Sequence, residues 1–180
     1  MQSVLITGAN RGLGLELSKR LAKSGFEVIM TGRDVQAITD ACNNVKELTT
    51  SSHVYPLLLD VANEEHIQSL PERIRQLPRS AKGLDLLVNN AAIKEDGWNV
   101  PVLTRLIETN VKSPVRLALL LAADKSALLN EGGRIMNVSW SGAQLKNFVS
   151  PYNQLMDLGS NTFADLDQLL AFDWFHPNRM

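Results

Sequence analysis

Short apolar runs alternate with longer amphipathic segments along most of the chain. The runs predict strands at residues 3–7, 26–32, 53–61, 84–90 and 133–139. They are apolar throughout, with no polar residue at every second position, which is typical of strands that helices cover on both faces. Five such strands separated by helices predict an α/β fold with a parallel, doubly wound sheet and right-handed crossovers.

The segments between the runs predict helices at residues 11–25, 34–48, 63–77 and 100–129. In the first of these, Leu13, Leu17 and Leu21 fall on one face and form the expected contact with the sheet. Gly25 follows as a stop signal.

Three residues predict where the other helices start or break. Asp34 stands where it can cap the second helix. Pro71 predicts a bend or restart in the third helix, and Pro114 an interruption in the fourth. Proline has these effects because it has no N–H and its ring collides with the preceding turn.

The alternation of strand and helix stops after Ser141. The remaining residues contain no convincing sixth strand, and they predict one short helix that Thr162 would cap. We therefore expect a domain over residues 1–141, followed by an irregular, partly helical extension over residues 142–180 that packs on the same domain. The strands at the carboxyl-terminal side of the fold are reduced or missing.

Composition excludes several classes of function. The formal net charge is −1, which argues against a nucleic-acid surface. Cys42 is the single cysteine, so an intrachain disulfide cannot form. No signal peptide is evident, and no apolar run is long enough to span a bilayer. His53, His66 and His176 lack the spacing of a metal site. We expect a cytoplasmic protein without a metal centre.

The segment TGANRGLG, Thr7 to Gly14, lies between the first strand and the first helix. Its glycines allow a tight turn, close approach of a pyrophosphate to the backbone, and close packing of helix on strand. The helix that begins there offers free N–H groups and a partial positive charge to phosphates. The motif in this context predicts a dinucleotide-binding loop.

The spacing Thr-Gly-x-x-x-Gly-x-Gly resembles that of short-chain dehydrogenases/reductases, a family of Rossmann-type enzymes. Further motifs follow in the family's order: LLLDV, LVNNAA, ETNVKSP and GRIMNVS. The resemblance covers residues 1–141 and implies a sheet with strand order 3-2-1-4-5. The residues that it implies in cofactor binding are Thr7, Gly8, Asn10, Arg11, Gly12, Leu13, Gly14, Arg33, Asp60, Val61, Asn89 and Ala91.

The end of the second strand favours NADP(H) over NAD(H). Gly32 stands where an acidic residue would hold the ribose 2′-OH, and Arg33 follows. With Arg11 in the glycine loop, two guanidinium groups are available to a 2′-phosphate. Asp34 is acidic, but as a helix cap it can point away from the cofactor.

The catalytic residues are less well defined. The resemblance implies a catalytic or structural role for Asn110 and a catalytic serine near residue 139, where Trp140 separates Ser139 from Ser141. Tyr152 has nearly the spacing of the family's catalytic tyrosine, but Met156 stands in place of the lysine four residues later. The segment around Tyr152 also resembles an insertion found in the carbonyl reductase branch. On that interpretation, the Tyr-x-x-x-Lys pair lies beyond residue 180.

Two functions remain open. The first is an NADP(H)-dependent oxidoreductase of carbonyl reductase type that acts on a small carbonyl substrate. The second is an inactive or truncated nucleotide-binding or scaffolding protein that retains only the cofactor half. The family resemblance also implies pairing of two copies through the helix at residues 101–130. We expect neither nucleic acid nor a membrane as a partner.

Overall fold

A computed structural model of the protein describes residues 1–79, 83–96, 99–122 and 128–139. It separates the chain into one unit, Met1–Val138, and a second, Ser139–Met180. The fold below is that of the first unit, since Ser139 is the only described residue of the second. The predicted extension over residues 142–180, with its helix after Thr162, lies outside the described residues.

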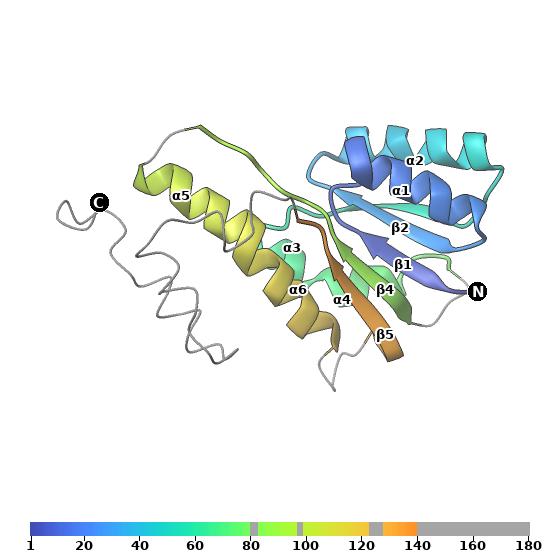
Figure 1. The fold of residues 1–180 in the computed structure, drawn as a ribbon. Coiled ribbons are helices and arrows are strands. Elements are labelled where there is room, and N and C mark those ends of the chain that lie inside the picture. The colour runs from blue at the N-terminus through green and yellow to red at the C-terminus, as the bar shows by residue number, and fades with distance from the viewer. Residues whose placement is uncertain (80–82, 97–98, 123–127, 140–180) are drawn as a thin grey trace. The chain divides into compact units, whose positions relative to one another are not determined.

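The first unit is built on a parallel sheet (Figure 1). Its strands are β1 (Ser3–Ile6), β2 (Glu27–Gly32), β3 (Val54–Leu58), β4 (Leu84–Asn89) and β5 (Leu129–Asn137). They lie in the order β3-β2-β1-β4-β5, and every neighbouring pair is parallel. This confirms the predicted α/β class, the Rossmann-type sheet and the strand order.

Helices lie against both faces of the sheet (Figure 1). One face carries α1 (Gly12–Lys23) and α2 (Val35–Thr49). The other carries α3 (Glu64–Gln68), α4 (Leu70–Arg75), α5 (Val100–Ile107) and α6 (Ser113–Ala122), with a π-helical turn, η1 (Glu108–Lys112), between the last two. The sheet is therefore doubly wound, as the apolar strands predicted.

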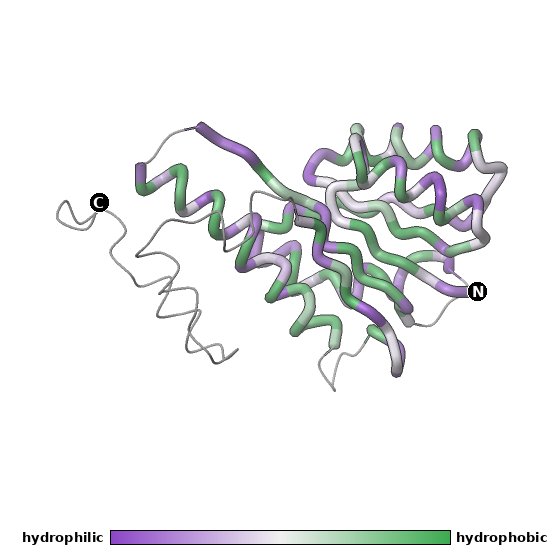
Figure 2. The backbone as a smooth tube through the Cα atoms, viewed as in Figure 1, coloured by the Kyte–Doolittle hydropathy of each residue, from purple (hydrophilic) through white to green (hydrophobic). Residues whose placement is uncertain are grey.

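The core has two halves, one on each face. Alternate residues of a strand point to opposite faces, so Val4 and Ile6 join the α1/α2 side while Leu5 joins the α3/α4/α6 side. In Figure 2 the central strands are mainly hydrophobic, whereas α1 and α2 carry both colours. Packing on both faces holds the strands in place, and this sets the positions of the loops at their carboxyl ends.

The predicted sheet-facing side of the first helix is partly wrong. Leu17 and Leu21 pack against the core, but Leu13 is 59% exposed. The side that meets the sheet consists of small residues, Gly14, Ser18 and Ala22, all of them buried. Small side chains are needed there because α1 lies close to the sheet behind the glycine loop.

The predicted helix boundaries hold at three positions. The Asp34 side chain accepts a hydrogen bond from the Ala37 N–H at 2.9 Å and caps α2. The third predicted helix restarts at Ser69, and Pro71 lies in the first turn of α4. The fourth widens into η1 directly before Pro114. That widening spares the Pro114 ring a collision with the carbonyl of Asn110, four residues earlier.

Strand β5 departs from the prediction in two ways. It begins at Leu129, four residues before the predicted start, and Leu129 was expected to be helical. A register shift, with Gly132 at φ +75°, joins its two parts. The strand is also largely exposed, with Met136 50% exposed, because β5 pairs with β4 alone at the edge of the described sheet. The expectation that helices cover both faces therefore fails for this strand.

Among the helices of the described ranges, none has the length and apolar character required to cross a lipid bilayer.

Candidate functional site: a cleft at the carboxyl ends of the strands

The glycine loop connects β1 to α1 and is held by side chains from the neighbouring strand end. The Thr7 hydroxyl accepts hydrogen bonds from the N–H groups of Asn90 and Ala91, both at 2.9 Å. The Asn90 amide donates to the carbonyls of Thr7 and Gly8, at 2.9 and 3.1 Å. Thr7 is almost completely buried, so its hydroxyl positions the loop rather than facing the solvent.

The glycines of the loop have different surroundings. A Cβ on Gly8 would lie 2.9 Å from the Ala91 Cα, and one on Gly14 would lie 2.5 Å from the Gly8 oxygen. A Cβ on Gly12 would meet nothing within 4 Å. Gly8 and Gly14 therefore allow the loop, helix and β4 to approach one another, while Gly12 leaves its side of the loop open to a ligand.

A cleft of about 620 Å³ opens beside the loop. Of the residues predicted to bind the cofactor, most line it: Gly8, Asn10, Arg11, Gly12, Arg33, Asp60, Val61 and Ala91. Four do not, namely Thr7, Leu13, Gly14 and Asn89. Thr7 and Gly14 support the loop from behind, as their contacts show.

Two guanidinium groups at the cleft lack a partner. Arg11 and Arg33 are exposed, and neither forms an ion pair within the described ranges. Arg11 is also the N-cap residue of α1, and its side chain makes no capping hydrogen bond. The first turn of α1 contains no acidic residue. This part of the cleft is therefore suited to an anionic group.

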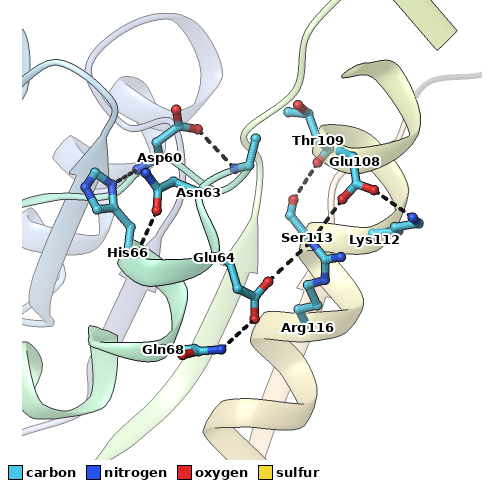
Figure 3. Close-up of polar contacts among 11 residues, drawn as sticks. Asp60, Asn63, Glu64, His66, Gln68, Glu108, Thr109, Lys112, Ser113 and Arg116 are labelled. Carbon is cyan, nitrogen blue, oxygen red and sulfur yellow. Dashed lines mark hydrogen bonds and ion pairs between the residues drawn. The ribbon is translucent and has the colours of Figure 1, made fainter. Parts of the chain in front are cut away.

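Asp60 begins a tight turn after β3 (Figure 3). Its carboxylate accepts from the Ala62 N–H at 3.0 Å, and its own N–H donates to Nδ1 of His66 at 3.1 Å. Asn63 caps α3 by accepting from the His66 N–H. The turn is thus fixed by a side chain that the sequence analysis assigned no role, because His66 acts on a backbone N–H six residues away and lies in no motif.

The opposite wall of the cleft comes from α5 and η1. Glu108 pairs with Lys112 at 2.6 Å and with Arg116 at 2.9 Å, and Arg116 also reaches Glu64 on α3 at 3.5 Å (Figure 3). The contact with Lys112 holds the pKa of Glu108 below its usual value. These ion pairs join α6, η1 and α3 below the cleft.

Glu95 and Arg105 form a second ion pair on this wall. The Arg105 Nε donates to both Glu95 carboxylate oxygens at 3.0 Å, and its Nη2 also contacts Oε2. Both residues line the cleft. This pair could not be predicted from the sequence, since Glu95 lies in the loop after β4 and Arg105 on α5, and no spacing rule connects the two.

Asn110 and Asn89 bind backbone and neighbouring side chains. Asn110 accepts from the Ile93 N–H at 2.9 Å and donates to the Ile93 carbonyl at 2.8 Å. Asn89 Nδ2 donates to the Asn137 Oδ1 at 2.8 Å, which links the ends of β4 and β5. Asn89 Oδ1 is a buried acceptor that has no hydrogen-bond partner among the residues that the structure describes. Asn110 therefore holds the loop that forms the cleft's floor, in keeping with a structural role.

The candidate catalytic hydroxyls are only partly described. Ser139 is exposed and follows directly after Val138, whose N–H donates to the Asn89 carbonyl at 2.9 Å. Ser141 and Tyr152 lie outside the described residues, as does Met156. Within the ranges that the structure describes, no group of His, Cys, Asp and Glu side chains could hold a metal ion.

Comparison with solved structures supports the fold. The menthone neomenthol reductase of Mentha piperita superimposes with a TM-score of 0.79 at 23% identity, covering 94% of this chain and 72% of that one. A variant of actinorhodin polyketide ketoreductase, solved with NADPH, gives 0.71 at 25% identity, covering 85% and 59%.

Comparison of sequences gives the family. The (+)-neomenthol dehydrogenase of Arabidopsis thaliana is 31% identical over 193 aligned residues, which cover 92% of this chain and 63% of that protein. Eight of the curated relatives are covered by this chain over 31% to 63% of their own length. The family model described as short chain dehydrogenase matches residues 2–153. The chain belongs to the short-chain dehydrogenase family.

Proposed function

We propose that the chain binds NADP(H) in the cleft and forms part of a reductase of carbonyl reductase type, acting on a small carbonyl compound. The observation that carries the proposal is the pair of guanidinium groups beside the glycine loop, Arg11 and Arg33, which form no ion pair among the described residues. A 2′-phosphate is an anion that such a pair can bind through bidentate, charge-assisted hydrogen bonds.

The residues present fit a dinucleotide along the whole cleft. Gly12 leaves open space for a pyrophosphate at the N-terminus of α1. The turn at Asp60 and Val61 would hold the adenine, and Ala91 lies against the loop where a ribose would pass. The Asp34 carboxylate caps α2 and does not line the cleft.

Two comparisons point the same way. The ketoreductase neighbour was solved with NADPH, and one relative, 29% identical over 147 residues, is named a probable NADP-dependent dehydrogenase. The curated relatives are named as reductases and dehydrogenases, which supports an oxidoreductase.

Nicotinamide would supply the hydride chemistry when bound. Ser139, two residues beyond the end of β5, is exposed and would hold a carbonyl oxygen, with Ser141 as the alternative. The proton donor is Tyr152 or a tyrosine in the portion of the relatives that this chain does not span. Pairing of two copies through the segment of residues 101–130 is proposed as well, on the exposed Val111 of η1 and Leu119 of α6.

The test combines binding with turnover on the 180-residue chain. NADPH and NADH are titrated by fluorescence, and oxidation of NADPH is followed at 340 nm with a panel of activated carbonyl compounds. We expect NADPH to bind more tightly than NADH. Equal affinities would refute the preference, failure to bind either would refute the proposal, and binding without turnover would refute a reductase activity of this chain.

A further inference from the structure

The ion pair of Glu95 and Arg105 lies on the wall of the cleft that faces the glycine loop and Arg33. Its two residues come from different elements, the loop after β4 and helix α5, and both line the same cleft as Arg33. The pair is half-exposed, with side-chain exposures of 31% for Glu95 and 53% for Arg105. It is therefore accessible to a bound ligand.

Glu95 acts electrostatically on two arginines at once. Arg105, by hydrogen bonding, and Arg33, at longer range, hold the pKa of the Glu95 carboxyl below its usual value. Glu95 thus forms an ion pair with Arg105 and lines the same cleft as Arg33, close enough for the two charges to interact. A phosphate bound at Arg33 would enter the same electrostatic field and would compete with the Glu95 carboxylate for both guanidinium groups.

We propose that Glu95 and Arg105 determine specificity for the phosphate group of the dinucleotide, with opposite effects. In the free protein, the Glu95 carboxylate occupies the place of the phosphate and so weakens phosphate binding. When the ion pair with Glu95 breaks, Arg105 becomes an additional ligand of the phosphate. The inference rests on the proposed function, because it assumes that a 2′-phosphorylated dinucleotide binds in this cleft.

This assignment predicts effects of opposite sign from the two residues. Glu95→Gln keeps the shape of the side chain, removes the competing anion and leaves Arg105 available, so the Kd for NADPH should fall about three- to tenfold. Arg105→Gln removes one cation and leaves Glu95 to pair with Arg33, so the Kd for NADPH should rise by about the same factor. The Kd for NADH should change less than about twofold in both variants.

The experiment measures Kd for NADPH and NADH, and for 2′,5′-ADP and 5′-AMP, in the wild-type chain, both single variants and the double variant. The double variant should fall between the two single ones. The changes should shrink in about 1 M salt, where the Debye length is only about 3 Å.

Asp96→Asn is the matched control. It removes one negative charge from the same loop, one residue away, from a side chain that does not line the cleft. Its NADPH to NADH ratio should stay at the wild-type value. A shift in Asp96→Asn equal to that in Glu95→Gln would overturn the proposal in favour of a general charge effect.

Two further results would overturn it. If Glu95→Gln and Arg105→Gln both weakened NADPH and NADH by the same factor, the pair would serve only to hold the loop on α5. If the wild-type chain preferred NADPH and neither variant altered the ratio, this inference would fail while the proposed function stood. Failure of the wild-type chain to bind either dinucleotide would reject the proposed function itself.

Discussion

Arginine side chains are buried and paired at one end of the parallel sheet and exposed at the other. At the amino ends of the strands, Arg79 is 4% exposed and its Nε donates to Glu27, which is fully buried, at 2.8 Å. Arg79 also donates to the Ser3 hydroxyl and the Gly83 carbonyl. At the carboxyl ends, Arg11 and Arg33 are exposed and form no ion pair among the described residues.

This difference separates a folding role from a binding role. A buried guanidinium loses its hydration, so it needs a carboxylate and further acceptors in fixed positions. An exposed guanidinium remains hydrated and requires no partner in order to fold. At the carboxyl ends of the strands, the open end of the sheet, the guanidinium groups of Arg11 and Arg33 are therefore available to an anionic ligand. At the amino ends, the closed end, the Arg79 guanidinium is already paired with Glu27.

The largest predicted effect concerns the closed end. Arg79→Met should lower the free energy of unfolding by about 3–5 kcal/mol, because the buried Glu27 would lose its ion pair with Arg79. Urea denaturation followed by circular dichroism measures this. Arg20→Met, which breaks the exposed pair with Glu16, is the control and should cost less than about 1 kcal/mol. The double variant Glu27→Leu/Arg79→Met should recover much of the loss. A cost below about 1 kcal/mol for Arg79→Met would contradict the role assigned to the pair.

At the open end we predict the reverse combination, a loss of binding without a loss of stability. Arg33→Gln should raise the Kd for NADPH about 10- to 100-fold, which corresponds to one charge-assisted hydrogen-bonded contact of about 1.5–3 kcal/mol. The Kd for NADH and the unfolding free energy should stay near the wild-type values. Arg20→Gln, an exposed arginine away from the cleft, is the control. An equal loss for NADH would mean that Arg33 does not contact the 2′-phosphate.

The sequence allowed the framework of the cleft to be predicted but not its walls. The glycine loop and Arg33 were found because each follows directly after an apolar strand, and Asp60 because the segment LLLDV resembles a motif of the family. Parallel strands bring their carboxyl ends to one edge of the sheet. Thr7 and Gly14 were assigned to cofactor binding, yet they act behind the loop. A motif identifies such residues without telling whether they face the ligand or the protein.

The residues that the sequence could not reveal act across long separations. Glu95 meets Arg105 only because the loop after β4 runs beside α5. The face of α1 was misjudged at Leu13 since hydrophobic spacing takes no account of how closely a helix approaches its sheet. The apolar composition of strand β5 predicts that it is buried. Burial, however, depends on the elements that pack beside the strand, and the sequence of the strand does not determine these.

His66 provides a test that lies between the two ends, since it positions the cleft without lining it. His66→Ala removes the acceptor for the Asp60 N–H, a hydrogen bond of about 0.5–1.5 kcal/mol. The turn that would hold the adenine should loosen, and affinity for NADPH and NADH should fall about two- to tenfold alike, because both carry adenine. His53→Ala, at the opposite end of β3, is the control. A change in the ratio of the two affinities would contradict a role limited to the Asp60 turn.

The smallest predicted effect concerns the contribution of the open end to the free energy of unfolding. Contact with Lys112 lowers the pKa of Glu108 in the folded protein, so the pair stabilises the fold above pH 4.5 and loses this contribution as the pH falls through the lowered value. For a partly exposed pair the contribution is at most about 1 kcal/mol. Glu108→Gln should therefore be less stable than wild type at pH 7, with the difference closing in more acidic solution.

Urea unfolding at pH 7 and at successively lower pH measures the stability of both proteins. Glu47→Gln is the control, since Glu47 is exposed and has no ion pair in the described ranges, and it should show no such closing. If the difference instead grew on acidification, the ion pair at η1 would not be the source of the stability. The contrast between a closed end that maintains the fold and an open end that binds would then need a different basis.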